Sequence, residues 1–238
     1  MRHALAVAAK APRPGTVKTR LLSLLSAEEA TELYRCFMKD TIESMESVSA
    51  AQVVVSYTPE GDESYFDGIL SNGHPLLAQR GEGFGDKLFN ALDDLLRDGF
   101  DTAAIMNADS PTLPRRYLAE CFEELARPGD RVVLGPATDG GYYLIGIKQP
   151  HRRLFEDITW STSSVLAETL DRAAELGLEV KLLPEWYDVD GVAEFERLKR
   201  EIREGPEDRE ARADSRFQAG AHTRRFILSR WPRAAAGR

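Results

Sequence analysis

The fold class is decided by residues 3–45, HALAVAAKAPRPGTVKTRLLSLLSAEEATELYRCFMKDTIESM. Residues 3–9 are small and apolar, which is typical of a strand that is buried on both faces of a sheet. Residues 26–45 carry apolar side chains at helical spacing, and Ser26 with Glu29 forms the pattern of a capping box. A buried strand, a loop and a capped helix in succession predict the first unit of an α/β fold.

The same alternation continues along the chain. Further short apolar runs are predicted as strands at 51–57, 74–79, 102–108, 131–137, 140–147 and 179–184. Helical periodicity is found at 86–99, 114–127 and 163–177. Gly99 and Gly177 stand where a glycine commonly ends a helix. Strands that alternate with helices predict a three-layer α/β fold with a mostly parallel sheet covered on both faces.

The 238 residues fit one α/β domain followed by an Arg-rich extension. We predict a main domain at 1–202 and an extension at 203–238 that loses apolar periodicity except at 226–231. The extension is expected to be loosely attached or partly disordered. It holds nine Arg and five Asp or Glu, so it carries +4 of the net charge of −8 and leaves −12 on the main domain. An acidic domain argues against nucleic-acid binding but allows a nucleotide, whose phosphates a few cations can neutralise.

Cysteine count and hydropathy predict a cytoplasmic protein without a membrane span. Cys36 and Cys121 both fall in predicted helices, which favours reduced thiols and excludes a disulfide scaffold or a zinc knuckle. The apolar start of the chain is broken by Lys10 and Pro12 and is therefore predicted as a strand, not a signal peptide. No apolar run approaches the roughly 20 residues that a membrane helix needs.

A basic loop follows the first predicted strand, at the position where open α/β sheets bind ligands. Backbone N–H groups and cations before a helix form a natural phosphate cradle. The P-loop motif needs Gly directly before Lys, and Val17 excludes it. A solvated basic turn is the alternative interpretation. The candidate phosphate-binding residues are Lys10, Pro14, Gly15, Lys18, Thr19 and Arg20.

Acidic residues follow two other predicted strands. Asp109 comes after 102–108 in an Asp-Ser-Pro turn, and a carboxylate there is suited to hold Mg²⁺ against phosphate oxygens. Asp188 and Asp190 follow the last strand, and alternation puts both on one side of an extended segment. The alternative is that these residues cap the helices that start near Pro114 and at 191–202.

A glycine-rich turn and a Trp-Ser-Thr segment supply the remaining candidates. Two glycines that open a strand indicate close backbone approach to a ligand, whereas a hairpin turn is the structural alternative. Asp139 is positioned to bind a substrate hydroxyl, and Tyr142 or Tyr143 to face a ring. For the Trp-Ser-Thr segment the alternative is a helix cap. The candidates are Asp139, Gly140, Gly141, Tyr142, Trp160, Ser161 and Thr162.

These motifs together resemble a bacterial branch of the GT-A-like nucleotide-diphospho-sugar transferases. The strings that carry the likeness are KAPRPGTVKTRL, DSP, GPATDGGYYLIGI, ITWST and DVD, in order over about residues 3–200. The branch is associated with arsenosugar and radical-SAM gene sets and is similar to the molybdenum-cofactor and phospholactate guanylyltransferases. The resemblance implies a Rossmann-like GT-A sheet, a nucleotide over its carboxyl edge, and Mg²⁺ or Mn²⁺ as the cofactor.

The resemblance also implies roles for particular residues. Asp109 and Asp190, with Asp188 as a neighbour, match the metal positions, and Asp109, Asp139 and Lys18 are the catalytic candidates. The chain departs from the family's Asp-Leu-Gly-x-Arg-Met stretch, where it has GFGDKL at 83–88, with Lys87 keeping a cation. It also has GVAE at 191–194 where Thr-Pro-Glu-Asp is usual.

The predicted function is a metal-dependent glycosyltransferase that takes a nucleotide-diphosphate sugar and a small-molecule acceptor. The alternative is a nucleotidyltransferase that joins a nucleoside triphosphate to a phosphorylated acceptor and releases pyrophosphate. A minor alternative is a nucleotide-binding protein without catalysis. A dehydrogenase, a serine hydrolase and a zinc enzyme are excluded, because their G-x-G-x-x-G, G-x-S-x-G and ligand patterns are missing. The sequence carries no signal for an oligomeric state.

Overall fold

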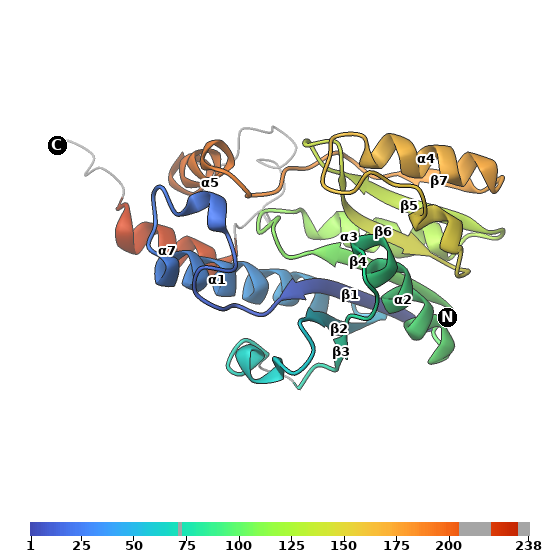
Figure 1. The fold of residues 1–238 in the computed structure, drawn as a ribbon, viewed down its shortest axis with the longest axis horizontal. Coiled ribbons are helices and arrows are strands. Elements are labelled where there is room, and N and C mark those ends of the chain that lie inside the picture. Colours follow the sequence, from blue (N-terminus) through green and yellow to red (C-terminus); the bar gives the residue numbers. More distant parts are fainter. Residues whose placement is uncertain (71–72, 205–219, 233–238) are drawn as a thin grey trace.

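The strands of the protein form one mixed sheet, as seen in a computed structural model that describes residues 1–70, 73–204 and 220–232 (Figure 1). Seven strands lie in the order β3-β2-β1-β4-β6-β5-β7 within these residues. The strands are β1 (His3–Lys10), β2 (Ala51–Thr58), β3 (Leu76–Ala78), β4 (Thr102–Asn107), β5 (Arg131–Pro136), β6 (Tyr142–Ile147) and β7 (Glu179–Leu182). Each run predicted as a strand therefore contains one, which confirms the α/β class.

The helices before residue 205 occupy the predicted intervals, whereas a further helix lies in the C-terminal extension, where none was predicted. The α-helices are α1 (Ala27–Glu46), α2 (Phe84–Arg97), α3 (Arg115–Leu125), α4 (Val165–Glu175), α5 (Val192–Glu204) and α7 (Ala221–Arg230). Short 3-10 helices lie at η1 (Thr19–Leu21), η2 (Glu63–Phe66) and η3 (Arg152–Phe155). The capping box is confirmed, because the Ser26 hydroxyl accepts from the Glu29 N–H and the Glu29 carboxylate accepts from the Ser26 N–H. Gly99 and Gly177 end α2 and α4 with φ of +85° and +65°.

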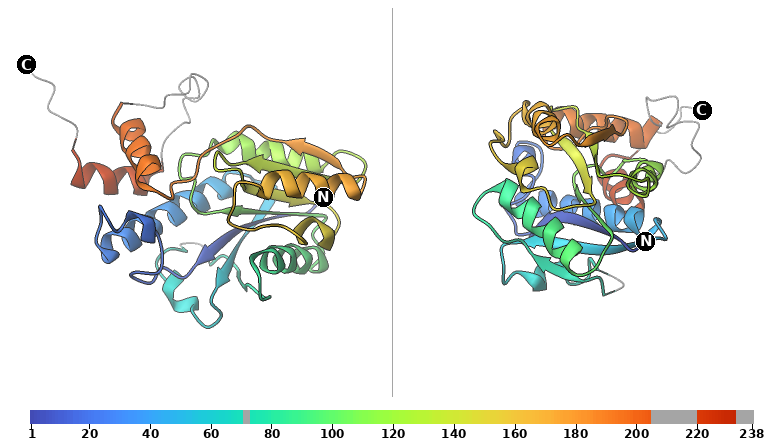
Figure 2. Two further views of the ribbon diagram at one scale, coloured as in Figure 1. Left: turned by 45° about the horizontal axis from the view of Figure 1, so that its top comes forward. Right: turned by 90° about the vertical axis from the view of Figure 1, so that its right-hand side faces the viewer.

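Two apolar clusters, one on each face of the sheet, form the core. Leu5 and Val7 of β1 point to the face that α1, α3, α5 and α7 cover, whereas Ala4 and Ala6 point to the face that α2 and α4 cover. The right-hand view of Figure 2 shows these two helical layers on either side of the strands. The predicted three-layer arrangement is confirmed. No helix in the described part of the chain is long and apolar enough to cross a membrane.

Strand β6 is the exception to the parallel direction. It runs antiparallel to both neighbours, β4 and β5, while the other pairings are parallel. The amino end of β6 consequently lies at the same edge of the sheet as the carboxyl ends of β1, β4, β5 and β7. This single reversal brings the turn between β5 and β6 to the edge where the other loops meet.

The described part of the C-terminal extension is packed against the domain, so the expectation of loose attachment was wrong for α7. This helix lies against α1 and α5, and its Phe226 and Ile227 are buried in the larger core cluster. Trp231 packs edge-on against Phe195 of α5, with ring centroids 5.6 Å apart. Apolar burial fixes the helix, although its sequence shows little periodicity. The remainder of the predicted extension, 205–219 and 233–238, lies outside the described residues.

Gly135 in β5 gives a direct test of core packing. A Cβ atom at this position would lie 2.3 Å from two ring carbons of Tyr143, which is fully buried and donates its hydroxyl hydrogen to the Pro184 carbonyl. We expect Gly135→Ala to lower the free energy of unfolding by about 1–3 kcal/mol through overpacking, measured by urea denaturation. Gly83→Ala is the matched control, because the nearest atom to its Cβ would be 3.9 Å away. A Gly135→Ala protein as stable as the control would contradict this account.

Candidate active site

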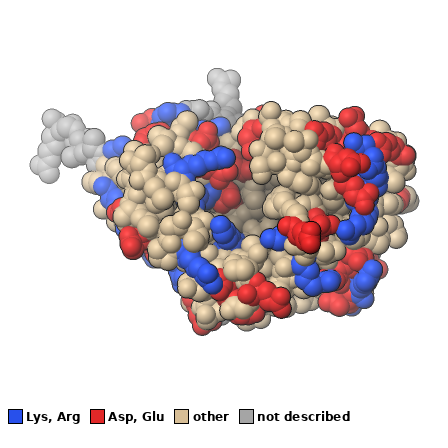
Figure 3. Space-filling view, viewed as in Figure 1, with Lys and Arg blue, Asp and Glu red and all other residues tan. Residues whose placement is uncertain are grey.

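The loops that follow β1, β4, β5 and β7 surround one cleft at the carboxyl edge of the sheet. Three adjoining cavities of about 450, 240 and 190 Å³ make up this cleft, and all three are lined by Arg20 and Asp190. Figure 3 shows that this face of the molecule is hollowed near its centre, with both basic and acidic side chains around the hollow. The largest cavity has the size of a typical small-molecule site.

Lys18 lies at the centre of the cleft and joins the loops to one another. Its Nζ is 2.7 Å from Asp109 Oδ1 and 2.9 Å from Asp190 Oδ1, and it donates to the Val189 carbonyl at 2.8 Å. The side chain is only 4% exposed. Burial alone would lower the pKa of Lys18, but the two carboxylates outweigh it and raise the pKa above its usual value. The lysine is therefore a charged group held between two acids.

The backbone of Lys18 is itself unusual. Its φ of +49° places a residue with a side chain in the left-handed region, at the start of η1. This conformation is sparsely populated for residues other than glycine and is found preferentially at functional sites. The turn aims the lysine side chain back toward the loops after β4 and β7.

Asp109 follows β4 and is tied to the loop after β7. Its carbonyl accepts the N–H of Val189 at 2.8 Å, and its own N–H donates to the Asn107 side chain at 3.2 Å. Burial raises the pKa of the Asp109 carboxyl, an effect that Lys18 opposes. The alternative that Asp109 caps α3 is wrong, because Pro114 is the N-cap residue and no side chain caps that helix.

Asp188 has a different partner from its neighbour Asp190. The Ser110 hydroxyl donates to Asp188 Oδ1, which links the Asp-Ser-Pro turn to the last motif. Burial raises the pKa of Asp188 to about 6, helped by the nearby charge of Asp109 and opposed by the Ser110 hydrogen bond. Asp188 thus holds the two loops together while still lining the largest cavity.

The acidic residues fit a divalent cation at one position. The Oδ1 atoms of Asp109 and Asp190 both converge on Lys18 Nζ, so a single cation reaches both. Asp109 Oδ1 is buried and contacts the Lys18 ammonium, so a metal ion that used this oxygen as a ligand would take the place of that ammonium. Carboxylate oxygens are the ligands that Mg²⁺ and Mn²⁺ prefer. The three carboxylates of Asp109, Asp188 and Asp190 do not bring ligand atoms all within 4.8 Å of one another, so the site is built on two of them.

Apart from Arg20, the basic loop and the glycine-rich turn line different cavities of the cleft. Lys10 Nζ donates to the Thr16 carbonyl at 3.0 Å and closes the loop on itself. Lys10, Lys18, Thr19 and Arg20 line the cavity of this loop together with Tyr34 from α1. Three cations thus border a space that also contains Asp109 and Asp190.

An aromatic wall borders the largest cavity. Trp160 meets Phe84 and Tyr142 edge-on, with ring centroids 5.1 and 6.4 Å away. Phe84 is 52% exposed although it is a large apolar side chain. Gly85 permits this packing, because a Cβ there would lie 2.7 Å from the Trp160 indole nitrogen. Sequence reasoning missed Phe84, and its only signal was that GFGDKL departs from the family pattern.

The turn between β5 and β6 is a hairpin and also borders the cleft. Asp139 accepts the N–H of Gly141 at 2.9 Å, and its exposed side chain lines two of the cavities. Gly140 has φ of +91°, and a Cβ there would lie 2.2 Å from the Ser163 carbonyl oxygen, so its role is close packing. Ser161 and Thr162 do not cap α4, because its N-cap is Ser164.

Most predicted site residues share this cleft, and a few do not line it. Those on its walls are Lys10, Lys18, Thr19, Arg20, Asp109, Asp139, Gly141, Tyr142, Trp160, Ser161, Thr162, Asp188 and Asp190. Those outside its walls are Pro14, Gly15, Lys87 and Gly140. Pro14 and Gly15 shape the loop, whereas Lys87 lies on α2, the helix that begins at Phe84.

Solved structures share this architecture. A protein from Desulfovibrio desulfuricans G20, described as a "putative nucleotide-diphospho-sugar transferase", is 28% identical with a TM-score of 0.83 over 96% of this chain and 95% of that chain. A CMP:2-keto-3-deoxy-manno-octonic acid synthetase complexed with CTP is 13% identical, with a TM-score of 0.54 over 83% of this chain and 97% of that one. The Mycobacterium tuberculosis glucosyl-3-phosphoglycerate synthase with Mn²⁺ and UDP is 12% identical, with a TM-score of 0.50 over 84% and 75%. The last two show the fold alone.

Fold and cleft place the chain among the transferases with the GT-A-like, nucleotide-diphospho-sugar transferase fold. It belongs to the family described as an uncharacterized protein conserved in bacteria (DUF2064), which matches residues 41–162, just over half of the chain. No curated protein matches the sequence.

Proposed function

We propose that the protein is a metal-dependent glycosyltransferase that uses a nucleotide-diphosphate sugar as donor. The observation that carries this proposal is the convergence of Asp109 and Asp190 on one cation position, between the basic loop and the cavity with the aromatic wall. A diphosphate needs positive charge at its centre, a base needs a flat apolar surface, and a sugar needs space beyond the phosphates. A cation position at Asp109 and Asp190, an aromatic wall and further cavity space beside Asp139 support the proposal.

In this proposal each part of the cleft has a separate task. Asp109 and Asp190 would hold Mg²⁺ or Mn²⁺, which supplies positive charge to the diphosphate and to the departing nucleoside diphosphate. Lys18, Lys10 and Arg20 would neutralise the remaining phosphate charge. Asp139 would accept the proton of the acceptor hydroxyl, whose oxygen forms the new bond to the sugar carbon as the bond from that carbon to the phosphate oxygen breaks and the nucleoside diphosphate leaves.

Thermal unfolding with candidate donors tests this proposal. Nucleoside triphosphates and nucleotide sugars would each be added with and without Mg²⁺ or Mn²⁺, and a ligand that binds only the folded chain raises the unfolding temperature. We expect a nucleotide sugar with metal to give the largest rise. Incubation of that donor with a panel of acceptors should then release the nucleoside diphosphate. A donor that binds without metal, or no donor that binds, would contradict the proposal.

A second candidate function is nucleotidyl transfer, and the cation density of the basic loop favours it. Lys10, Lys18 and Arg20 border one cavity, and three phosphates need more neutralisation than two. The phosphorylated acceptor would attack the α-phosphorus and displace pyrophosphate in line. Release of pyrophosphate from a nucleoside triphosphate plus acceptor would distinguish this reaction from glycosyl transfer. Binding of nucleotides without turnover of any kind would favour a non-catalytic role.

Phe84 provides a test of where the base lies. We propose that its exposed ring stacks on the nucleobase, because it stands on the aromatic wall at the entrance of the largest cavity. Base–aromatic stacking contributes about 1–3 kcal/mol, so Phe84→Ala should weaken donor binding roughly tenfold or more and leave kcat nearly unchanged. Leu176→Ala, at another exposed apolar residue outside the cleft, is the control. Equal KM for both variants would rule out a base at Phe84.

The cytoplasmic location stays a prediction.

A further inference from the structure

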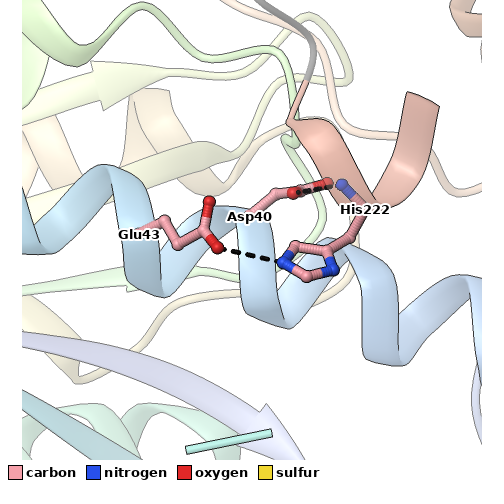
Figure 4. Close-up of side chains that lie close together, drawn as sticks. All are labelled: Asp40, Glu43 and His222. Carbon is pink, nitrogen blue, oxygen red and sulfur yellow. Dashed lines mark hydrogen bonds and ion pairs between the residues drawn. The ribbon is translucent and has the colours of Figure 1, made fainter. Parts of the chain in front are cut away.

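A second group of metal-binding side chains lies outside the cleft, where α7 meets α1. Asp40, Glu43 and His222 present ligand atoms that all lie within 4.8 Å of one another. Figure 4 shows the Glu43 carboxylate on α1 facing the His222 imidazole on α7, while the Asp40 carboxylate beside it faces the main-chain nitrogen of His222. His222 Nε2 is 2.9 Å from Glu43 Oε1. None of the three residues lines the cavities that contain Asp109 and Asp190.

The backbone holds this group in position. Asp40 and Glu43 are three residues apart on α1 and therefore share one side of the helix. Asp40 accepts the N–H of His222 at 3.0 Å with Oδ1 and the N–H of Thr223 at 2.8 Å with Oδ2. These two bonds satisfy donors at the start of α7, so His222 is placed against Asp40 by main-chain contacts.

Gly220 allows this close approach. A Cβ at Gly220 would lie 1.8 Å from Asp40 Cγ, so no larger residue fits there unless α7 shifts. Phe226 and Ile227 fix the rest of α7 through burial in the core. The junction of α1 and α7, two helices that are far apart in the chain, thus brings the imidazole and the two carboxylates together.

The junction also contains a buried hydroxyl beside Asp40. The Thr223 side chain is fully buried and interacts with the Asp40 carboxylate through a poorly aligned contact. Each Asp40 oxygen accepts one N–H and keeps a second lone pair. Two carboxylates face one imidazole, so the group is net negative whether or not the imidazole is protonated. A dication would balance this charge.

We propose that Asp40, Glu43 and His222 bind a divalent transition metal, with Zn²⁺ as the best match, that clips α7 to α1. One imidazole nitrogen with two carboxylate oxygens is a ligand set that Zn²⁺, Co²⁺ and Ni²⁺ accept, whereas Mg²⁺ prefers oxygen alone. The side chains of Glu43 and His222 are 47% and 29% exposed, so the ion reaches the site from solvent and water completes its coordination. Since only the docked chain presents all three ligands, the ion stabilises the docked helix.

Zinc titration of the metal-free full-length protein tests the proposal. We expect one Zn²⁺ in the wild type that raises the unfolding temperature by roughly 5 °C at saturation. Glu43→Gln keeps the shape of an exposed side chain and removes a ligand, so it should weaken this binding by more than about 100-fold, as should His222→Ala. Bound Co²⁺, followed by its visible absorption, gives a second readout.

Two further variants make the result specific. Asp130→Asn alters the similar pair of His151 and Asp130, which are 2.6 Å apart and have no third ligand beside them in the described part of the chain, and it should leave zinc binding unchanged. Asp109→Asn should also retain this ion, which separates the site from the one in the cleft. Metal-free unfolding of Glu43→Gln checks that the variant is folded. Absence of zinc binding in the wild type, or equal affinity in the wild type and Glu43→Gln, would overturn the proposal.

Discussion

Replacing Asp109 by asparagine is expected to abolish metal-dependent turnover, a loss of about 1,000-fold or more. In the proposed function Asp109 Oδ1 is the buried metal ligand of the cleft, and an amide at this position neither carries the charge nor binds a divalent ion comparably. The measurement is the initial rate of nucleoside diphosphate release with Mg²⁺ or Mn²⁺. Binding of the donor in the presence of metal should fall in parallel.

Asp94→Asn is the control for this substitution. Asp94 lies on α2 and its carboxylate is 2.5 Å from Arg80. The substitution therefore also deprives a cation of its carboxylate partner, but it leaves the cleft intact. We expect its rate to match that of the wild type. A near-normal rate in Asp109→Asn would show that the cleft does not use this carboxylate for catalysis.

Replacing Lys18 by methionine should reduce both stability and turnover. Loss of the charge leaves Asp109 and Asp190 close together without a cation. Removal of one partner of a fully buried pair costs about 3–5 kcal/mol, and because Asp109 and Asp190 are 30% and 46% exposed we expect about 1–2 kcal/mol in metal-free urea unfolding. Turnover should fall about 100-fold, because the diphosphate loses a charged donor.

The same variant should respond more strongly to metal. Lys18 Nζ occupies the position that a divalent ion needs, so its removal eliminates a competing cation. Mn²⁺ is therefore expected to stabilise Lys18→Met more than the wild type. Lys148→Met is the matched control, because Lys148 lies outside the cleft and its Nζ donates to the carbonyls of Arg127 and Gly129. Its loss should change neither the turnover nor the response to Mn²⁺ much. Equal metal-free stability of Lys18→Met and the wild type would contradict the central role of this lysine.

Much of the cleft could be predicted because of a general property of α/β sheets. Lys18, Asp109 and Asp190 each follow a strand, and parallel strands bring such loops to a common edge. Their contacts could not be predicted. The sequence indicated a lysine for phosphate and two aspartates for metal, but the structure joins all three through one ammonium group. A contact between residues 18 and 190 depends on strand order, which local patterns do not encode.

Phe84 and Asp188 are two further residues whose contacts could not be predicted from the local sequence. An exposed phenylalanine in GFGDKL has no periodicity that marks it as a wall of a cavity, and its position depends on Trp160 and Gly85. Strand alternation did not distinguish Asp188 from Asp190, and only the family resemblance selected Asp190, yet the Ser110 hydroxyl donates to Asp188. Side chains two positions apart on an extended segment share a face but not a partner.

The sequence alone determined the α/β class, the alternation of strands and helices, the capping box at Ser26, and the loops that carry the candidate site. These features follow from local burial and from backbone groups near in the chain, which periodicity and cap residues express directly. Tertiary structure decided the reversed direction of β6, the ammonium bridge of Lys18, and the docking of α7 on α1 beside Asp40. Each of these depends on which distant segment becomes the neighbour, because packing and charge pairing act through space and not along the chain.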